Sequence, residues 1–238
     1  MQALILAAGR GTRLGPLTEQ TPKPMLELSG RPLLDWQLDY LAQQGVHHTF
    51  INAHHRSEVI SEYYRARAEV TVVNEARLRG TAGTASDIAM RLGSGPLVVL
   101  YGDVVIREPL AEALVLVTSG SAQLVLFVHE EPDVSAKGAV ALDQHRVVGF
   151  IEKSGIHEPG LVNSGMYVLE PAILPAPGRE PMDFGHDLIP HLLARHVPVT
   201  AIRCQSQVID IGTPAGLSAA RQLTVTVLAG GPSTPSTR

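Results

Sequence analysis

The sequence holds one cysteine in 238 residues, Cys204. A lone cysteine cannot form a disulfide within its own chain, and such sparing use is typical of a reducing compartment. No apolar stretch reaches about 18 residues, the length that a membrane-spanning helix requires. Residues 1–15 carry no basic segment ahead of a long apolar run, so they do not resemble a secretory signal. We therefore expect a cytoplasmic protein that does not contact a membrane.

Charge is also scarce, because Asp, Glu, Lys and Arg make up 18% of the residues and the formal net charge is −4. Without a lysine-rich run, a nucleic-acid partner is disfavoured. Hydrophobic residues make up 45% of the chain, enough for a sizeable core. We expect one globular domain over residues 1–228 and a disordered tail, rich in Gly, Pro, Ser and Thr, over residues 229–238. The sequence leaves open whether the chain forms a homodimer.

Short apolar runs alternate with helical patterns in the first half. Strands are predicted over residues 2–6, 49–52, 70–73 and 97–101, and helices over residues 32–44, 58–67 and 84–91. This alternation predicts a parallel sheet with helices on both faces. The second half has closely spaced strand candidates at 122–129, 138–142, 147–152 and 162–169, then helices at 185–194 and 214–222. The sequence thus predicts a single-domain, Rossmann-like α/β fold, whose mainly parallel, mixed sheet has an antiparallel or mixed extension.

The most informative segment is the loop after the first predicted strand, LAAGRGTRL at residues 6–14, with PKP at residues 22–24. Glycines let the backbone approach a ligand and turn its N–H groups toward phosphate oxygens. Arg13 and Lys23 add two positive charges, as a bound triphosphate requires. The loop is not a P-loop, because no Lys follows its second glycine. Leu14 stands where a dinucleotide fingerprint needs a small residue.

Two carboxylates lie at the ends of apolar segments. Asp103 follows the predicted strand at 97–101, and Asp210 precedes the predicted helix at 214–222. The carboxyl end of a strand is where α/β folds place their ligand crevice. Two carboxylates with substrate phosphates form a sparse oxygen set that suits Mg²⁺. From the residues alone, each Asp could instead form a turn or cap a helix.

The pattern AG-x-GTRL-x-PLT at residues 8–18, followed by PKP, resembles the signature of the sugar-1-phosphate nucleotidyltransferases, and the similarity continues to residue 222. The resemblance implies an enzyme that joins a nucleoside triphosphate to a sugar 1-phosphate and releases pyrophosphate. It implies Mg²⁺ held by Asp103 and Asp210, with Arg13 and Lys23 as the other catalytic residues. The implied nucleotide-binding residues are Leu6, Ala8, Gly9, Gly11, Thr12, Arg13, Lys23, Glu75, Gly80 and Thr81.

The resemblance also implies a sugar-phosphate site made of Gly83, Tyr101, Gly138, Glu152, Lys153 and Asn163. In it, Glu152 and Asn163 hold hydroxyl groups and Lys153 contacts the phosphate. Taken alone, Glu-Lys at the end of a strand is an ordinary solvated turn. Two positions depart from the family pattern, since Val208 stands where an aromatic residue is common and Tyr101 where Asn is common. The sugar preference is therefore open.

Residues 183–187, DFGHD, are similar to segments in relatives that act on mannose or heptose phosphates, although a helix N-cap is the plainer role. We expect GTP as the donor, with Glu75 accepting from guanine, and a mannose- or heptose-type 1-phosphate as the acceptor. The alternatives are a uridylyl- or thymidylyltransferase on a hexose 1-phosphate, a cytidylyltransferase on an alcohol phosphate, and a non-catalytic nucleotide-sensing subunit. The pairs His47-His48 and His54-His55 flank a predicted strand, but strand neighbours point to opposite faces, so neither pair can readily chelate one metal ion. We expect these histidines to be surface or capping residues.

Overall fold

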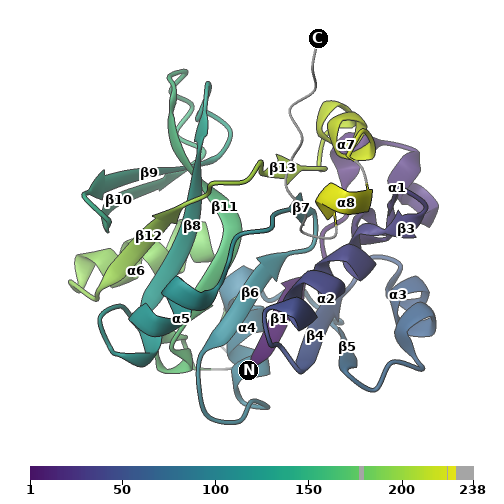
Figure 1. Ribbon diagram of the computed structural model, residues 1–238, viewed down its shortest axis with the longest axis horizontal. Helices are drawn as coiled ribbons and strands as arrows, with labels where there is room; N and C mark the ends of the chain where they lie inside the picture. Colours follow the sequence, from purple (N-terminus) through teal and green to yellow (C-terminus); the bar gives the residue numbers. More distant parts are fainter. Residues whose placement is uncertain (177–179, 224, 229–238) are drawn as a thin grey trace.

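A nine-stranded sheet with the order β5-β4-β1-β6-β11-β8-β12-β10-β9 forms the centre of the molecule. The computed structural model describes residues 1–176, 180–223 and 225–228, so the predicted tail at 229–238 lies outside the described residues. Helices cover both faces of the sheet (Figure 1). The predicted α/β fold class is thereby confirmed.

The first half of the sheet is parallel. Its strands are β1 (Gln2–Leu6), β4 (His48–Ala53), β5 (Val70–Asn74) and β6 (Leu97–Tyr101). Ala3, Leu4 and Ile5 are fully buried in β1, because helices cover this half on both sides. The carboxyl ends of these strands meet at one edge, which places the glycine-rich loop after β1 beside Asp103 after β6.

The second half of the sheet is mixed, as predicted. Its strands are β8 (Leu124–Glu131), β9 (Gly138–Asp143), β10 (Arg146–Glu152), β11 (Gly160–Leu169) and β12 (Val199–Arg203). β11 runs antiparallel to β6 and β8 and so joins the two halves, while β12 runs parallel to β8. β12 is missing from the predicted strands, because its short run gives little periodicity before it pairs with β8.

Three helices pack on one face of the sheet, α2 (Leu33–Gln43), α3 (Ser57–Tyr64) and α5 (Ala111–Thr118), and two on the other, α4 (Thr81–Ala89) and α6 (Ile189–Ala194). α5 was not predicted. Its apolar residues surround the helix and leave Val115 exposed, so no clear helical period marked it. The helix predicted over 185–194 divides into a π-helical turn, η4 (Phe184–Leu188), and α6.

A separate two-stranded ladder joins distant parts of the chain. β7 (Val104–Val105) pairs antiparallel with β13 (Ile209–Asp210), and Asp210 lies opposite Val104. A third buried cluster, which includes Trp36, Ile211 and Leu217, packs the ladder against α2 and α7 (Pro214–Arg221). The remaining short elements are η1 (Thr12–Leu14), α1 (Leu17–Gln20), η2 (Lys23–Met25), β2 (Glu27–Leu28), β3 (Arg31–Pro32), η3 (Pro171–Ile173) and α8 (Val225–Leu228). The ladder brings Asp210 next to Asp103.

No helix in the described part of the chain is long and apolar enough to cross a membrane.

Candidate active site

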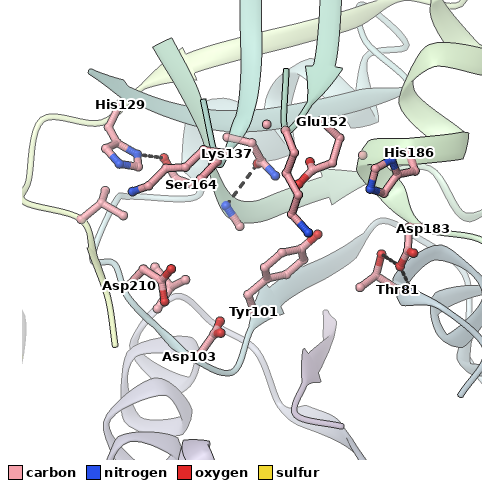
Figure 2. Close-up of a pocket in the computed structure, with 18 of the residues that line it drawn as sticks. Thr81, Tyr101, Asp103, His129, Lys137, Glu152, Ser164, Asp183, His186 and Asp210 are labelled. Atoms are coloured by element: carbon pink, nitrogen blue, oxygen red, sulfur yellow. Dashed lines mark hydrogen bonds between the residues drawn. The ribbon is translucent and has the colours of Figure 1, made fainter. Parts of the chain in front are cut away.

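A pocket of about 300 Å³ lies where the two halves of the sheet meet (Figure 2). Nine of the residues singled out for a site line it: Arg13, Thr81, Tyr101, Asp103, Gly138, Glu152, Lys153, Asn163 and Asp210. Leu6, Gly9 and Lys23 line a smaller cavity that shares Asp103 with the pocket. Ala8, Gly11, Thr12, Glu75, Gly80 and Gly83 line neither.

Four charged side chains gather at the edge shared by the two cavities. Lys23 Nζ lies 2.6 Å from Asp103 Oδ2, and the Lys23 side chain is only 9% exposed. Arg13 Nη2 lies 3.9 Å from Asp210 Oδ2 and is far more open to solvent. The Ile211 N–H donates to the Asp103 carbonyl at 2.9 Å, which locks the two Asp segments together. The cluster holds two carboxylates and two cations, so its formal charges balance.

Gly212, which was not among the predicted site residues, lies inside this cluster. Its N–H donates to Asp210 Oδ1 at 2.6 Å. A Cβ at this position would lie 2.7 Å from Asp210 Oδ1, 2.8 Å from Arg13 Nη2 and 3.0 Å from Lys23 Nζ. The position therefore needs glycine to leave room for three of the four charged groups.

The glycine-rich loop after β1 presents unpaired amides. The Asn52 side chain accepts from the Ala7 N–H at 2.7 Å and fixes the start of the loop. Beyond it, the N–H groups of residues 8–11 donate to no residue that the structure describes. Successive free N–H groups form an anion-binding concavity. The loop can thus offer its backbone to phosphate oxygens beside Lys23.

Glu75 lies at the same sheet edge, behind the loop. Its Oε1 accepts from Thr84 Oγ1 at 2.5 Å and from Asn52 Nδ2 at 3.2 Å. Its Oε2 is buried and accepts no hydrogen bond from any described residue. An unpaired buried carboxylate oxygen is costly, so it calls for a donor.

The Asp183 segment docks on the N-terminus of α4. Asp183 occupies the N-cap position of η4, as predicted, but its carboxylate does not cap that helix. Instead Asp183 Oδ1 accepts from the Thr81 N–H at 2.9 Å and from Thr81 Oγ1 at 3.1 Å. The Asp187 carboxylate accepts from the Asp183 N–H. Asp183 therefore binds the first residue of α4, a helix far from it in the sequence. Asp183 and His186 also line the pocket.

The wall of the pocket that β10 and η4 form is called the far wall, and on it Glu152 lies between Gly138 and Gly185. A Cβ at Gly185 would overlap Glu152 Oε2, and one at Gly138 would lie 2.8 Å from it. Tyr101 forms the centre of the pocket in Figure 2. Burial raises the pKa of Tyr101 to about 12, so its hydroxyl stays protonated at neutral pH. The wall thus offers one charged acceptor and one neutral hydroxyl to a ligand.

Asn163 is held by the protein before any ligand arrives. Its Nδ2 donates to the Tyr167 hydroxyl at 2.5 Å, and its Oδ1 accepts from the Gly165 N–H at 3.1 Å. Among the described residues, no partner takes its second N–H or its second lone pair. Asn163 therefore lines the pocket as a pre-oriented group.

Sequence reasoning missed His129, Lys137 and Ser164 in the pocket lining, whereas His186 belongs to the 183–187 segment that the sequence had singled out. The three missed residues belong to no motif: His129 lies in β8, Ser164 in β11 and Lys137 just before β9. The only available signal was for Lys137, because the chain has just three lysines. The four paired histidines lie outside the pocket, and each ring contacts a protein group: Met1, Thr71, Glu75 and Thr18, respectively.

A family model and named relatives agree on the class of proteins to which this chain is similar. Residues 2–226 match the family model described as "Nucleotidyl transferase". The UTP–glucose-1-phosphate uridylyltransferase of Synechocystis is 30% identical over 89% of this chain and 60% of its own length. The mannose-1-phosphate guanylyltransferase of Mycobacterium tuberculosis is 32% identical over 82% of this chain and 56% of its own. The chain thus spans about 60% of the length of these curated relatives.

Solved structures match over more of their length. The crystal structure of HddC from Yersinia pseudotuberculosis has a TM-score of 0.79 and 26% identity, and the match covers 93% of this chain and 98% of HddC. HddC was also crystallised in complex with GMP-PN. A putative glucose-1-phosphate thymidylyltransferase from Bacillus anthracis, at 20% identity and a TM-score of 0.81, shares the fold.

Proposed function

This chain belongs to the nucleotidyl transferase family, and from this premise we propose that it transfers a nucleotidyl group from a nucleoside triphosphate to a sugar 1-phosphate and releases pyrophosphate. One observation carries the proposal most strongly. Asp103, Asp210, Arg13 and Lys23 meet between a loop with free amides and a pocket lined by hydroxyl-binding groups. A donor triphosphate fits the loop, and a phosphorylated sugar fits the pocket.

The donor side follows from charge and backbone geometry. The free N–H groups of residues 8–11 donate to the triphosphate oxygens, and Arg13 and Lys23 add positive charge beside them. As the bond to the α-phosphorus breaks, negative charge develops on the leaving pyrophosphate, where these cations stabilise it. Catalysis is then mainly positioning and charge stabilisation, with no protein nucleophile required.

The two carboxylates fit a magnesium ion only in part. Asp103 and Asp210 offer oxygen ligands, and the described residues place no cluster of three or more His, Cys, Asp or Glu side chains that could hold a metal. Mg²⁺ typically takes one or two carboxylates and completes its shell with water and substrate phosphates. When bound, Mg²⁺ would neutralise charge on the phosphates. Arg13 and Lys23 would then exchange their carboxylate partners for phosphate oxygens.

On the acceptor side, the sugar ring packs against the far wall. Glu152 accepts hydrogen bonds from ring hydroxyls, and the protonated Tyr101 hydroxyl offers a donor or an acceptor. The 1-phosphate points toward Asp103 and Asp210, and Lys153 binds it. The sugar phosphate oxygen then attacks the α-phosphorus in line with the leaving group.

For the substrate pair, we propose GTP with a mannose- or heptose-type 1-phosphate. Glu75 Oε2 is the supporting observation, because this buried oxygen has no donor among the described residues. Guanine presents N–H groups on its pairing edge, whereas uracil and thymine present one N–H between two carbonyls. The printed names of relatives include both guanylyl- and uridylyltransferases, so uridylyl transfer is the second candidate.

Glu75→Gln tests the donor assignment. A hydrogen bond from a guanine N–H to a charged carboxylate contributes about 1.5–3 kcal/mol of binding free energy, and Glu75→Gln removes that charge. We therefore expect kcat/KM for GTP to fall about tenfold or more. UTP turnover should change much less, so the GTP-to-UTP ratio is the measurement. Glu58→Gln, on the exposed face of α3, is the matched control. An unchanged ratio would show that Glu75 does not read the base.

A substrate matrix tests the reaction itself. GTP, UTP, dTTP and CTP are each incubated with mannose, glucose and heptose 1-phosphates, and pyrophosphate release is measured. We expect release that depends on both substrates, highest with GTP. Preference for UTP or dTTP would overturn the donor assignment alone. Nucleotide binding without turnover in any combination would favour the nucleotide-sensing subunit instead.

A further inference from the structure

Lysine is rare in this chain, and all of it lies at the site. The sequence contains three lysines against 16 arginines. Lys23 pairs with Asp103, and Lys137 and Lys153 line the pocket. Every Lys or Arg residue away from the candidate site is therefore an arginine. Lysine supplies a compact point charge with three rotatable donors, unlike the fixed planar fork of arginine. The restriction of lysine to these positions points to a role for each ammonium group.

We propose that Lys137 and Lys153 together form a two-lysine site for the phosphate group of the acceptor sugar. This inference rests on the proposed transfer reaction and adds a residue to it. Neither the signature loop nor the Glu-Lys segment contains Lys137.

The backbone holds the two lysines side by side. Gly138 and Glu152 are paired in register between β9 and β10. The next pair outward is Lys137 and Lys153, and the Lys153 N–H donates to the Lys137 carbonyl at 2.9 Å. Lys153 has a φ of 52°, in the left-handed region that residues other than glycine seldom adopt.

The charges around the pair leave room for an anion. Lys137 Nζ donates to Glu131 Oε1, whereas no described carboxylate pairs with Lys153. Burial raises the pKa of Glu131, but the hydrogen bond and charge of Lys137 outweigh it, so the pKa is lowered and Glu131 is ionised. The Lys153 ammonium therefore has no ion-pair partner among the described residues, although Glu152 lines the same pocket. This ammonium is available to a phosphate oxygen, and Lys137 can join it by exchanging Glu131 for the same anion.

His129 and Ser164 fix the counter-ion. Burial lowers the pKa of His129, so its ring is neutral at neutral pH. Because Glu131 can only accept, His129 Nε2–H donates to it at 3.2 Å, and Ser164 Oγ–H then donates to Nδ1 at 2.8 Å. The chain of bonds holds Glu131 in place. Lys137 can leave it for a phosphate oxygen without disturbing the wall.

The two sides of the pocket carry different side chains, which suit the phosphate and the ring of a sugar phosphate, respectively. Figure 2 shows His129, Ser164 and Asp210 on one side, and Glu152, His186, Asp183 and Thr81 on the other. Lys137 reaches the first side, because its ammonium shares Glu131 with His129. That side is where a 1-phosphate must lie to approach the nucleotide. The opposite side holds the acceptors that suit ring hydroxyls.

Kinetics of lysine variants test the proposal. Lys137→Met and Lys153→Met are each expected to raise the apparent KM for the best acceptor at least about tenfold, since each removes a charge-assisted hydrogen bond. The KM for the nucleotide should not change. The control is Arg203→Met, which breaks the Arg203–Glu130 ion pair outside the pocket and should leave both KM values unchanged. If Lys137→Met lowers stability but leaves the acceptor KM unchanged, Lys137 is only a structural ion-pair partner and the proposal fails.

A binding measurement separates this proposal from the reaction. Reductive methylation with carbon-13 formaldehyde keeps the lysine charge and labels each of the three lysines. Lys137→Arg and Lys153→Arg assign the NMR signals. Titration with inorganic phosphate is expected to shift the Lys137 and Lys153 signals together, with one binding constant. A shift of Lys153 alone, or of neither, overturns the two-lysine site even if transfer is observed. If no substrate pair reacts, the proposed function fails while this titration still decides the site.

Discussion

Asp103→Asn and Asp210→Asn are each expected to lower kcat by at least about 100-fold, because even groups that only support a metal ligand contribute 10–100-fold. The asparagine side chain keeps the shape and one acceptor oxygen but loses the charge that would hold Mg²⁺. In Asp210→Asn the Gly212 N–H can still donate to the remaining side-chain oxygen, so the local fold should survive. Pyrophosphate release over a range of Mg²⁺ concentrations is the measurement.

The two variants should differ in stability. Asp103 balances the nearly buried Lys23, whereas Asp210 balances the more exposed Arg13. Removing one partner of a buried pair leaves an uncompensated charge, so Asp103→Asn should lower Tm more than Asp210→Asn. Asp143→Asn, at the end of β9 and outside the pocket, is the control for both readouts. Activity of either site variant within about threefold of the parent at limiting Mg²⁺ would refute the metal assignment.

Gly212→Ala is expected to lower kcat/KM by about 100-fold, because misplacing reacting groups by about 1 Å has effects of this size. The added Cβ would overlap the ends of three charged side chains, on Asp210, Arg13 and Lys23. These ends are flexible and can move aside, so the change in Tm should be small. The displaced groups are nevertheless the ones that must meet the triphosphate.

The measurement is kcat/KM for the nucleotide beside a thermal unfolding curve. Gly93→Ala is the matched control, because a Cβ there meets nothing within 4 Å and its backbone φ is not positive. We expect Gly93→Ala to match the parent in both readouts. If Gly212→Ala does the same, the charged cluster tolerates displacement and its geometry does not control the rate.

Local sequence determined much of the fold. The strand at residues 97–101 matches β6 to the residue, because a run of apolar residues buried on both sides carries its own signal. The mixed second half was also predicted. β12 and α5 were missed, since both owe their form to pairing and packing with distant segments.

For the candidate site as well, the sequence revealed local motifs but not the contacts between distant segments. The glycine-rich loop and the two Asp segments stand out as short motifs, and the resemblance to sugar-1-phosphate nucleotidyltransferases is confirmed by the family match and the named relatives. The motifs do not say that β7 and β13 pair and bring Asp210 to Asp103. His129, Lys137 and Ser164 meet only through strand pairing in the second half. For the same reason, the carboxylate of Asp183 was expected at its own helix and serves α4 instead.

The central claim is that the nucleotide is cut between its α- and β-phosphates while the α-phosphate passes to a sugar phosphate. It is tested most directly by following radiolabelled GTP in two parallel reactions with the best acceptor. Label at the α-phosphate should appear in a sugar nucleotide, and label at the γ-phosphate should appear in pyrophosphate, in equal amounts. Release of the γ-label as inorganic phosphate, or α-label that stays in free nucleotide, would contradict nucleotidyl transfer.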